Sequence, residues 1–104
     1  AVDKLGMETV LKLLKHLNEK GQLNERQINI LGYKLLNNGR TDDAIDVFKL
    51  NVAAFPNSAN TYDSLGEAYM KAGMKEPAIQ NYKKSLELNP DNSNAVAMLK
   101  RLND

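Results

Sequence analysis

The sequence predicts an all-α fold, an α–α superhelix built from stacked pairs of helices. Apolar residues recur at steps of three and four along most of the chain, which is the spacing of one helix face. The chain also repeats itself, because Leu31-Gly32 returns as Leu65-Gly66 after 34 residues. A repeat of that length is typical of helix pairs that bury their apolar faces only by stacking on neighbours.

Length and composition describe one modest domain. The chain has 104 residues, of which 42% are apolar and 26% charged, and its net charge is +1. Lys and Arg are spread along the chain, so no nucleic-acid partner is expected. The absence of cysteine excludes disulfides, thiolate ligands and Cys nucleophiles. No apolar run approaches the ~20 residues that a membrane span needs.

Residues 1–22 are expected to form a leading amphipathic helix that does not follow the repeat. Its apolar stripe consists of Met7, Val10, Leu11, Leu14 and Leu17. Asp3 is expected to cap the start of this helix, and Gly21 to end it in a left-handed conformation. We interpret it as an extra helix that covers the first repeat. A linker helix to an upstream domain is the alternative.

Two repeats follow, at residues 25–58 and 59–92, and residues 93–104 are expected to form a capping helix. The second repeat carries aromatic, small and helix-ending residues at regular offsets, namely Tyr62, Leu65, Gly66, Tyr69, Ala78, Tyr82 and Pro90. The first repeat carries matching residues 34 positions earlier, namely Leu31, Gly32, Ala44, Phe48 and Pro56. Gly39 and Gly73 form a further pair, at the turn inside each repeat.

Each residue type in the repeat has a physical reason. Small residues allow two helices to cross closely, and a larger side chain there costs roughly 1–3 kcal/mol. Ala78→Leu is therefore expected to cost more stability than Ser85→Leu. Thr41 is expected to cap a helix that runs through Phe55. The last helix is expected to have Asn92 as its cap and an apolar stripe of Ala95, Val96, Leu99 and Leu102.

These offsets make residues 25–102 similar to the tetratricopeptide repeat family. The resemblance implies a module that binds a protein or peptide segment on its concave face, which the first helix of each pair lines. On that face it places Arg26, Asn29, Tyr33, Leu36 and Asn37 in the first repeat, Asn60, Asp63, Glu67, Met70 and Lys71 in the second, and Asn94, Ala97 and Arg101 in the capping helix. Repeats that clamp a C-terminal carboxylate carry Lys and Asn where this chain has Asn29 and Tyr33, so no such clamp is expected.

No catalytic, cofactor-binding or metal-binding set is visible, so the chain is not expected to be an enzyme. His16 is the single histidine, and without cysteine it cannot form a metal cluster of the usual type. Ser64 lacks the Gly-x-Ser-x-Gly pattern of hydrolases. Asp42 and Asp43 are better explained as first-turn residues that the helix dipole favours.

A narrower resemblance is carried by the stretches ILGYKLL, DDAIDVFKLNVAAFPNSANTYDSLGEAY and AIQNYKKSLELNPDNSNAVAMLKRL. They are similar to the C-terminal repeat module of some bacterial serine hydrolases, of esterase or β-lactamase-like type. This resemblance implies that the chain, which begins without Met, is a piece of a longer protein with an upstream catalytic domain. The alternative function is then a structural or dimerising appendage, partnered by that catalytic domain or by a second copy.

Overall fold

The structure is a computed structural model that describes residues 4–103. Asp3, the expected first cap, lies outside the described residues. The chain forms six helices over the described range, in the order α1 (Lys4–Glu19), α2 (Glu25–Asn37), α3 (Thr41–Ala54), α4 (Ala59–Lys71), α5 (Lys75–Leu88) and α6 (Ser93–Asn103). The all-α fold predicted from the apolar spacing is therefore confirmed.

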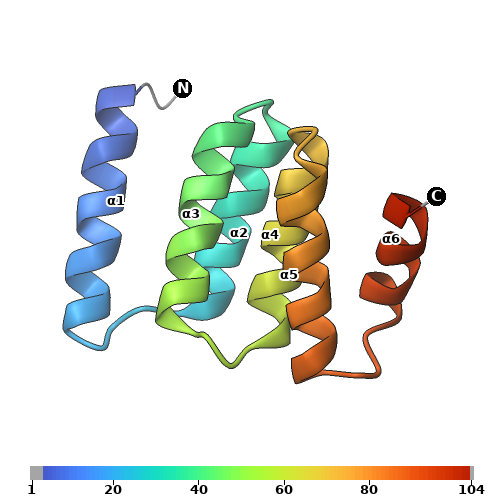
Figure 1. The fold of residues 1–104 in the computed structure, drawn as a ribbon. Helices are drawn as coiled ribbons and strands as arrows, with labels where there is room; N and C mark the ends of the chain where they lie inside the picture. The colour runs from blue at the N-terminus through green and yellow to red at the C-terminus, as the bar shows by residue number, and fades with distance from the viewer. Residues whose placement is uncertain (1–3, 104) are drawn as a thin grey trace.

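The helices form two layers (Figure 1). α3 and α5 lie in one layer, and α2 and α4 lie behind them in the other. Neighbours in sequence are neighbours in space, because the main helix contacts are α2 with α3, α3 with α4, α4 with α5, and α5 with α6. α2 also contacts α4, and α1 packs on α3 at one end of the array. Such stacking of successive helix pairs gives the superhelix that the 34-residue repeat predicts.

The small residues sit at the close helix crossings, as expected. A Cβ on Gly32 of α2 would lie 2.3 Å from the Phe48 ring of α3. A Cβ on Gly66 of α4 would lie 3.1 Å from the Tyr82 ring of α5. Each aromatic ring therefore occupies the space that the glycine leaves free. Phe48 and Tyr82 have no exposed surface, so these two contacts form the centre of each repeat.

Several helix ends follow the predicted chemistry. Gly21, Gly39 and Gly73 have positive φ angles, which glycine adopts without a Cβ penalty. The backbone N–H of Gln27 donates to the Asn24 side chain at 3.1 Å, and the N–H of Ala95 donates to the Asn92 side chain at 3.2 Å. Asn24 and Asn92 therefore cap α2 and α6.

Three local predictions were wrong. Thr41 is the first residue of α3, and the capping position is Arg40, which makes no side-chain capping bond but pairs with Asp43 at 2.6 Å. Phe55 lies just beyond α3, since the helix ends one residue earlier. Val96 is 52% exposed, because the buried side of α6 is set by Ala95 and the partly buried Met98, Leu99 and Leu102.

A buried polar contact ties the two helices of each repeat together. The side-chain amide of Asn51 on α3 donates to the Glu25 carbonyl at the start of α2, at 3.1 Å. The Ser85 hydroxyl on α5 donates to the Ala59 carbonyl at the start of α4, at 2.8 Å. Asn51 and Ser85 are both fully buried and stand 34 residues apart. The premise that only Ala78 of this pair is enclosed is therefore wrong, because neither Ala78 nor Ser85 has exposed surface, and the relative cost of Ala78→Leu and Ser85→Leu stays a prediction.

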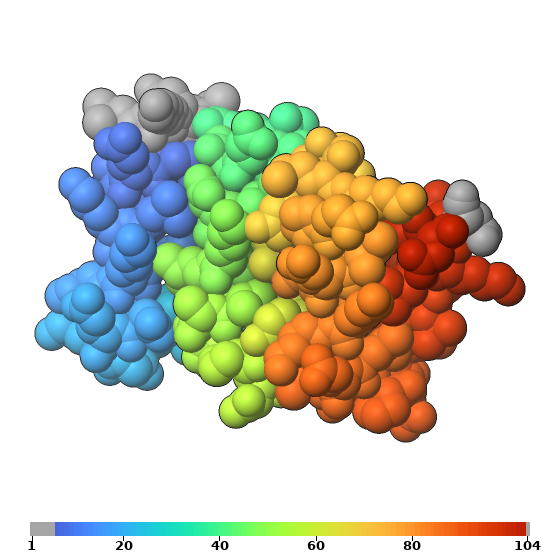
Figure 2. Space-filling model, viewed as in Figure 1, coloured from blue at the N-terminus to red at the C-terminus, as the bar shows by residue number. Residues whose placement is uncertain are grey.

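One face of the molecule consists mainly of α1, α3 and α5 (Figure 2). These helices appear in blue, green and orange, with α6 in red at the far end. α1 joins the core chiefly through Met7, which is 4% exposed, with Leu11 and Leu14 packed beside it. The predicted binding residues do not come from these helices. They come from α2, α4 and α6.

Candidate functional site

The predicted binding residues come from α2, α4 and α6, and we refer to their shared surface as the α2–α4–α6 face. Equivalent positions of successive repeats line up across it, because Tyr33, Glu67 and Arg101 are each 34 residues apart. Its central residues are half-buried, namely Asn29, Tyr33, Asp63, Glu67 and Met70. Its outer residues are exposed, namely Arg26, Asn37, Asn60, Lys71, Asn94, Ala97 and Arg101.

Leu36 does not belong to this surface. Its side chain is only 4% exposed and is part of the hydrophobic core. The resemblance to the tetratricopeptide repeat predicted Leu36 on the binding face. Its apolar side chain instead packs in the hydrophobic core between the helices. It therefore supports the fold and offers no contact to a ligand.

Hydrogen bonds connect the three helices across the face. The Tyr33 hydroxyl on α2 donates to the Glu67 carboxylate on α4 at 3.1 Å. The Asn94 side-chain amide on α6 donates to both carboxylate oxygens of Asp63 on α4, at 3.0 and 3.1 Å. Beneath them, the buried Ser64 hydroxyl donates to the Asn29 side-chain oxygen at 2.6 Å. These bonds fix the positions of the central side chains.

The carboxylates of Asp63 and Glu67 form no ion pair among the described residues. Their hydrogen-bond donors, Asn94 and Tyr33, are neutral. Within residues 4–103, the ion pair that forms is Arg40 with Asp43, and it lies elsewhere on the molecule. Two like charges four residues apart on a helix repel each other. The centre of the face is therefore negative, although the chain as a whole has a net charge of +1.

Two tyrosines lie beside these carboxylates. Burial, and then the negative charge of Glu67, raise the pKa of Tyr33 to about 12, although a hydrogen bond with Ser64 acts in the opposite direction. The Tyr33 ring also packs edge-on against Phe48, with ring centroids 5.2 Å apart. Burial raises the pKa of Tyr82 as well, and the charges of Asp63 and Glu67 raise it further. Both hydroxyls thus stay protonated at neutral pH.

The Tyr82 hydroxyl was not anticipated from the sequence. Tyr82 has no exposed surface, and its hydroxyl has no hydrogen-bond partner among the described residues. The ring reaches across Gly66 of α4, whose missing side chain leaves room for it. The end of the ring that carries the hydroxyl lies against Gly66 of α4, with Tyr82 Cζ 3.1 Å from the place of a Gly66 Cβ, and Gly66 stands between Asp63 and Glu67 in the sequence. The repeat pattern predicts an aromatic residue at position 82, but it does not show where the hydroxyl group of a tyrosine there would lie.

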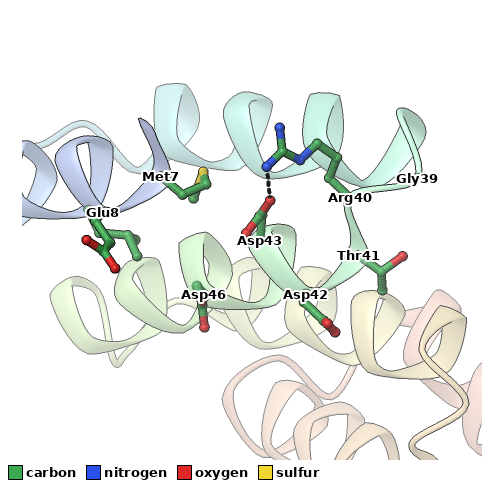
Figure 3. A pocket seen from close by; sticks show the side chains of 9 residues that line it. Met7, Glu8, Gly39, Arg40, Thr41, Asp42, Asp43 and Asp46 are labelled. Carbon is green, nitrogen blue, oxygen red and sulfur yellow. Dashed lines mark ion pairs between the residues drawn. The ribbon is translucent and has the colours of Figure 1, made fainter. Parts of the chain in front are cut away.

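A larger pocket lies away from this face, between α1 and the start of α3 (Figure 3). Its volume is about 680 Å³. Met7 and Glu8 line it from α1, while Arg40, Asp42 and Asp46 are among the residues that line it from the other side. Arg40 is held by the Asp43 carboxylate in this pocket. A smaller pocket of about 280 Å³ touches the α2–α4–α6 face through Met70 and Arg101.

Within residues 4–103, no cluster of three His, Cys, Asp or Glu side chains is placed to hold a metal ion. His16 is exposed near the end of α1. Ser64 is buried, and its hydroxyl donates to the Asn29 side-chain oxygen. None of the described helices is long and apolar enough to cross a membrane.

Comparison with known proteins supports the repeat. Residues 59–92 match the family model of the tetratricopeptide repeat. Mouse Superkiller complex protein 3 is 31% identical over 91 residues, which make up 86% of this chain and 6% of that protein. The chain thus spans a small part of the length of this relative.

Solved structures show the same fold. The chain superposes with a TM-score of 0.73 on the first tetratricopeptide repeat domain of Spaghetti (RPAP3) bound to the HSP90 peptide SRMEEVD, at 18% identity over 98% of this chain and 94% of that one. It superposes with a TM-score of 0.72 on YrrB, a tetratricopeptide repeat protein with an unusual peptide-binding site, at 22% identity over 91% of this chain and 49% of that one. The fold of this chain is therefore that of tetratricopeptide repeat proteins.

Proposed function

We propose that this chain is a protein-interaction module that binds a peptide or protein segment on its α2–α4–α6 face. The observation that carries the proposal is the set of hydrogen bonds from Tyr33 to Glu67 and from Asn94 to Asp63, which order polar side chains of three helices on one surface. Side chains ordered before binding lose less conformational entropy when a ligand arrives. Two proteins of the same fold support the same function. YrrB has an unusual peptide-binding site, and the Spaghetti domain is bound to an HSP90 peptide.

Selection from a random peptide library displayed on phage tests the proposal. The chain, immobilised as a folded domain, is expected to enrich peptides over an empty surface. Tyr33→Phe combined with Asp63→Ala removes two of the bridging groups while keeping the aromatic packing on Phe48. This variant is expected to lose the enriched peptides.

A matched control lies on the opposite layer. Gln80→Ala combined with Lys83→Ala changes two exposed residues of α5 and is expected to retain the same peptides. No enrichment by the parent chain, or equal losses in both double variants, would contradict binding at the α2–α4–α6 face.

A second function is favoured by exposed apolar residues at the two ends of the array. Leu13 on α1 is 55% exposed and Val96 on α6 is 52% exposed. Such residues are suited to contact a second copy or an adjoining domain of a parent protein, such as the serine hydrolase that the sequence resemblance implies. Light scattering of the chain over a range of concentrations tests it. A concentration-dependent dimer that Leu13→Ser or Val96→Ser abolishes supports this function, and a monomer at all concentrations contradicts the self-association.

A further inference from the structure

We propose that the centre of the α2–α4–α6 face selects a positively charged side chain of the bound segment, with arginine the best match. The inference rests on the proposed function and names the chemistry of its ligand. The receiving groups are the carboxylates of Asp63 and Glu67 together with the Tyr82 hydroxyl. A segment that presents an acidic group at this point is expected to be rejected.

The first reason is the unbalanced charge at the centre. Asp63 and Glu67 are held in place by a neutral amide and a neutral hydroxyl, so their position is fixed while their charge remains. Both are half-buried, where charge interactions are screened less than at the open surface. Their mutual repulsion along α4 destabilises the free protein slightly. A bound cation would relieve that repulsion.

The second reason is the buried Tyr82 hydroxyl. A buried polar group without a partner is unfavourable, and most such groups in folded proteins are hydrogen-bonded. The end of the ring that carries this hydroxyl lies against Gly66 of α4, which stands between Asp63 and Glu67 in the sequence. It has no hydrogen-bond partner among the described residues and no exposed surface, so a guanidinium would supply its missing bond only by entering the surface at this point.

These groups together match a guanidinium. Arginine has five N–H donors and no acceptor, and its planar fork suits carboxylate oxygens. The α2–α4–α6 face offers acceptors on Asp63 and Glu67, and the Tyr82 hydroxyl of α5 is buried beside Gly66 of α4. Charge-assisted bonds of this kind are about twice as strong as neutral ones. The position equivalent to Glu67 in the last helix is Arg101, which is exposed and makes no ion pair among the described residues.

Peptides enriched from the library allow a direct test. They are expected to share an arginine or lysine at one position. Replacing that residue by glutamine in a synthetic peptide is expected to weaken binding about tenfold or more. Asp63→Asn combined with Glu67→Gln keeps the size of both side chains and is expected to remove the difference between the two peptides.

Three further variants separate a specific site from general attraction. Asp42→Asn with Asp46→Asn removes the same charge from the exposed surface of α3 and is expected to leave the affinity unchanged. Tyr82→Phe is expected to weaken the arginine peptide several-fold without lowering the thermal midpoint of the free chain. Arg101→Gln removes a nearby like charge and is expected to tighten binding of that peptide.

The outcomes distinguish the two proposals. If the library yields no peptide, the proposed function fails. If peptides are enriched but share no positive charge, or bind equally to the Asp63→Asn, Glu67→Gln variant, only the cation-selective centre fails. Weaker binding by Arg101→Gln would also contradict it, because Arg101 would then contribute an attractive contact.

Discussion

Single side chains decide how closely the helices of each repeat approach. Gly32 and Gly66 occupy equivalent positions, but the space around them differs. A methyl group at Gly32 would lie 2.3 Å from the fully buried Phe48 ring, whereas one at Gly66 would lie 3.1 Å from the Tyr82 ring. The first distance requires the ring or the helix to move. The second requires a shift of a few tenths of an ångström.

We therefore expect Gly32→Ala to lower the free energy of unfolding by roughly 1–3 kcal/mol, the usual cost of overpacking. Gly66→Ala is expected to be close to neutral, because alanine gains up to about 1 kcal/mol of helix propensity over glycine. Urea denaturation of both variants measures the difference. Equal losses, or a larger loss for Gly66→Ala, would contradict the packing described here.

The half-buried side chain of Tyr33 should make the free energy of unfolding depend on alkaline pH. Burial, followed by the charge of Glu67, raises its pKa from 10.0 to about 12 in the folded chain. The unfolded chain then loses the proton first, so the stabilisation is complete below pH 10 and declines as the pH approaches 12. Thermal unfolding across this range is expected to show a shallower decline in the Tyr33→Phe variant. Parallel declines in the variant and the parent would contradict a raised pKa at this tyrosine.

Among the helices, α1 contacts the hydrophobic core through only part of its surface. Met7 is 4% exposed and packs into the main cluster, whereas Leu13 of the same helix is 55% exposed. Met7→Ala is expected to cost about 2–5 kcal/mol, as for other large-to-small changes in a core. Leu13→Ala is expected to change stability by about 0.5 kcal/mol or less. Denaturation midpoints of the two variants compare them, and a small loss for Met7→Ala would show that α1 is only loosely attached.

α6 covers the other end of the array. It packs on α5, buries Ala95 completely and is tied to α5 by a hydrogen bond from Asn92 to Ser85 at 2.8 Å. Deleting residues 93–104 is expected to expose apolar surface of the second repeat and to cause self-association. Light scattering of the truncated chain measures this. A monomer that still unfolds cooperatively would contradict the capping role.

The positions of the helices could be predicted from the sequence because helix formation depends largely on interactions between residues close together in the chain. Apolar spacing, the Asn24 and Asn92 caps and the turn glycines Gly39 and Gly73 each act within a few residues. Thr41 misled the prediction, since Arg40 occupies the capping position instead. Helix ends can be placed from the sequence only to within one or two residues, because the terminal turn is irregular.

Contacts between helices were harder to predict. Ser85 looks like a surface residue in the sequence, yet it is fully buried and bonded to the Ala59 carbonyl. Its equivalent Asn51 uses a different side chain for the same contact, so residue identity does not repeat even where the geometry does. Leu36 and the Tyr82 hydroxyl illustrate the same point for the candidate site. Their surroundings depend on which neighbouring helix they meet.

Considered as an assembled domain, the molecule places its two kinds of surface on different helices. α3 and α5 supply the fully buried aromatics Phe48 and Tyr82 and the face shown in Figure 2. α2, α4 and α6 supply the polar residues that are bonded to one another, such as Tyr33, Glu67 and Asn94. Apart from Tyr82, whose hydroxyl belongs to the proposed cation-selective centre, the residues that hold the repeat together are thus distinct from those proposed to bind a partner. Substitution on the α2–α4–α6 face should therefore change binding with little effect on folding.

The central claim is that a peptide binds to α2, α4 and α6, and NMR of the ¹⁵N-labelled chain tests it most directly. Titration with a peptide enriched from the library is expected to shift the backbone amides of Asn29, Asp63 and Glu67. Amides of the exposed residues Asp46 on α3 and Gln80 on α5 are expected to stay unchanged. Shifts concentrated on α3 and α5, with none at Asp63 and Glu67, would contradict the account.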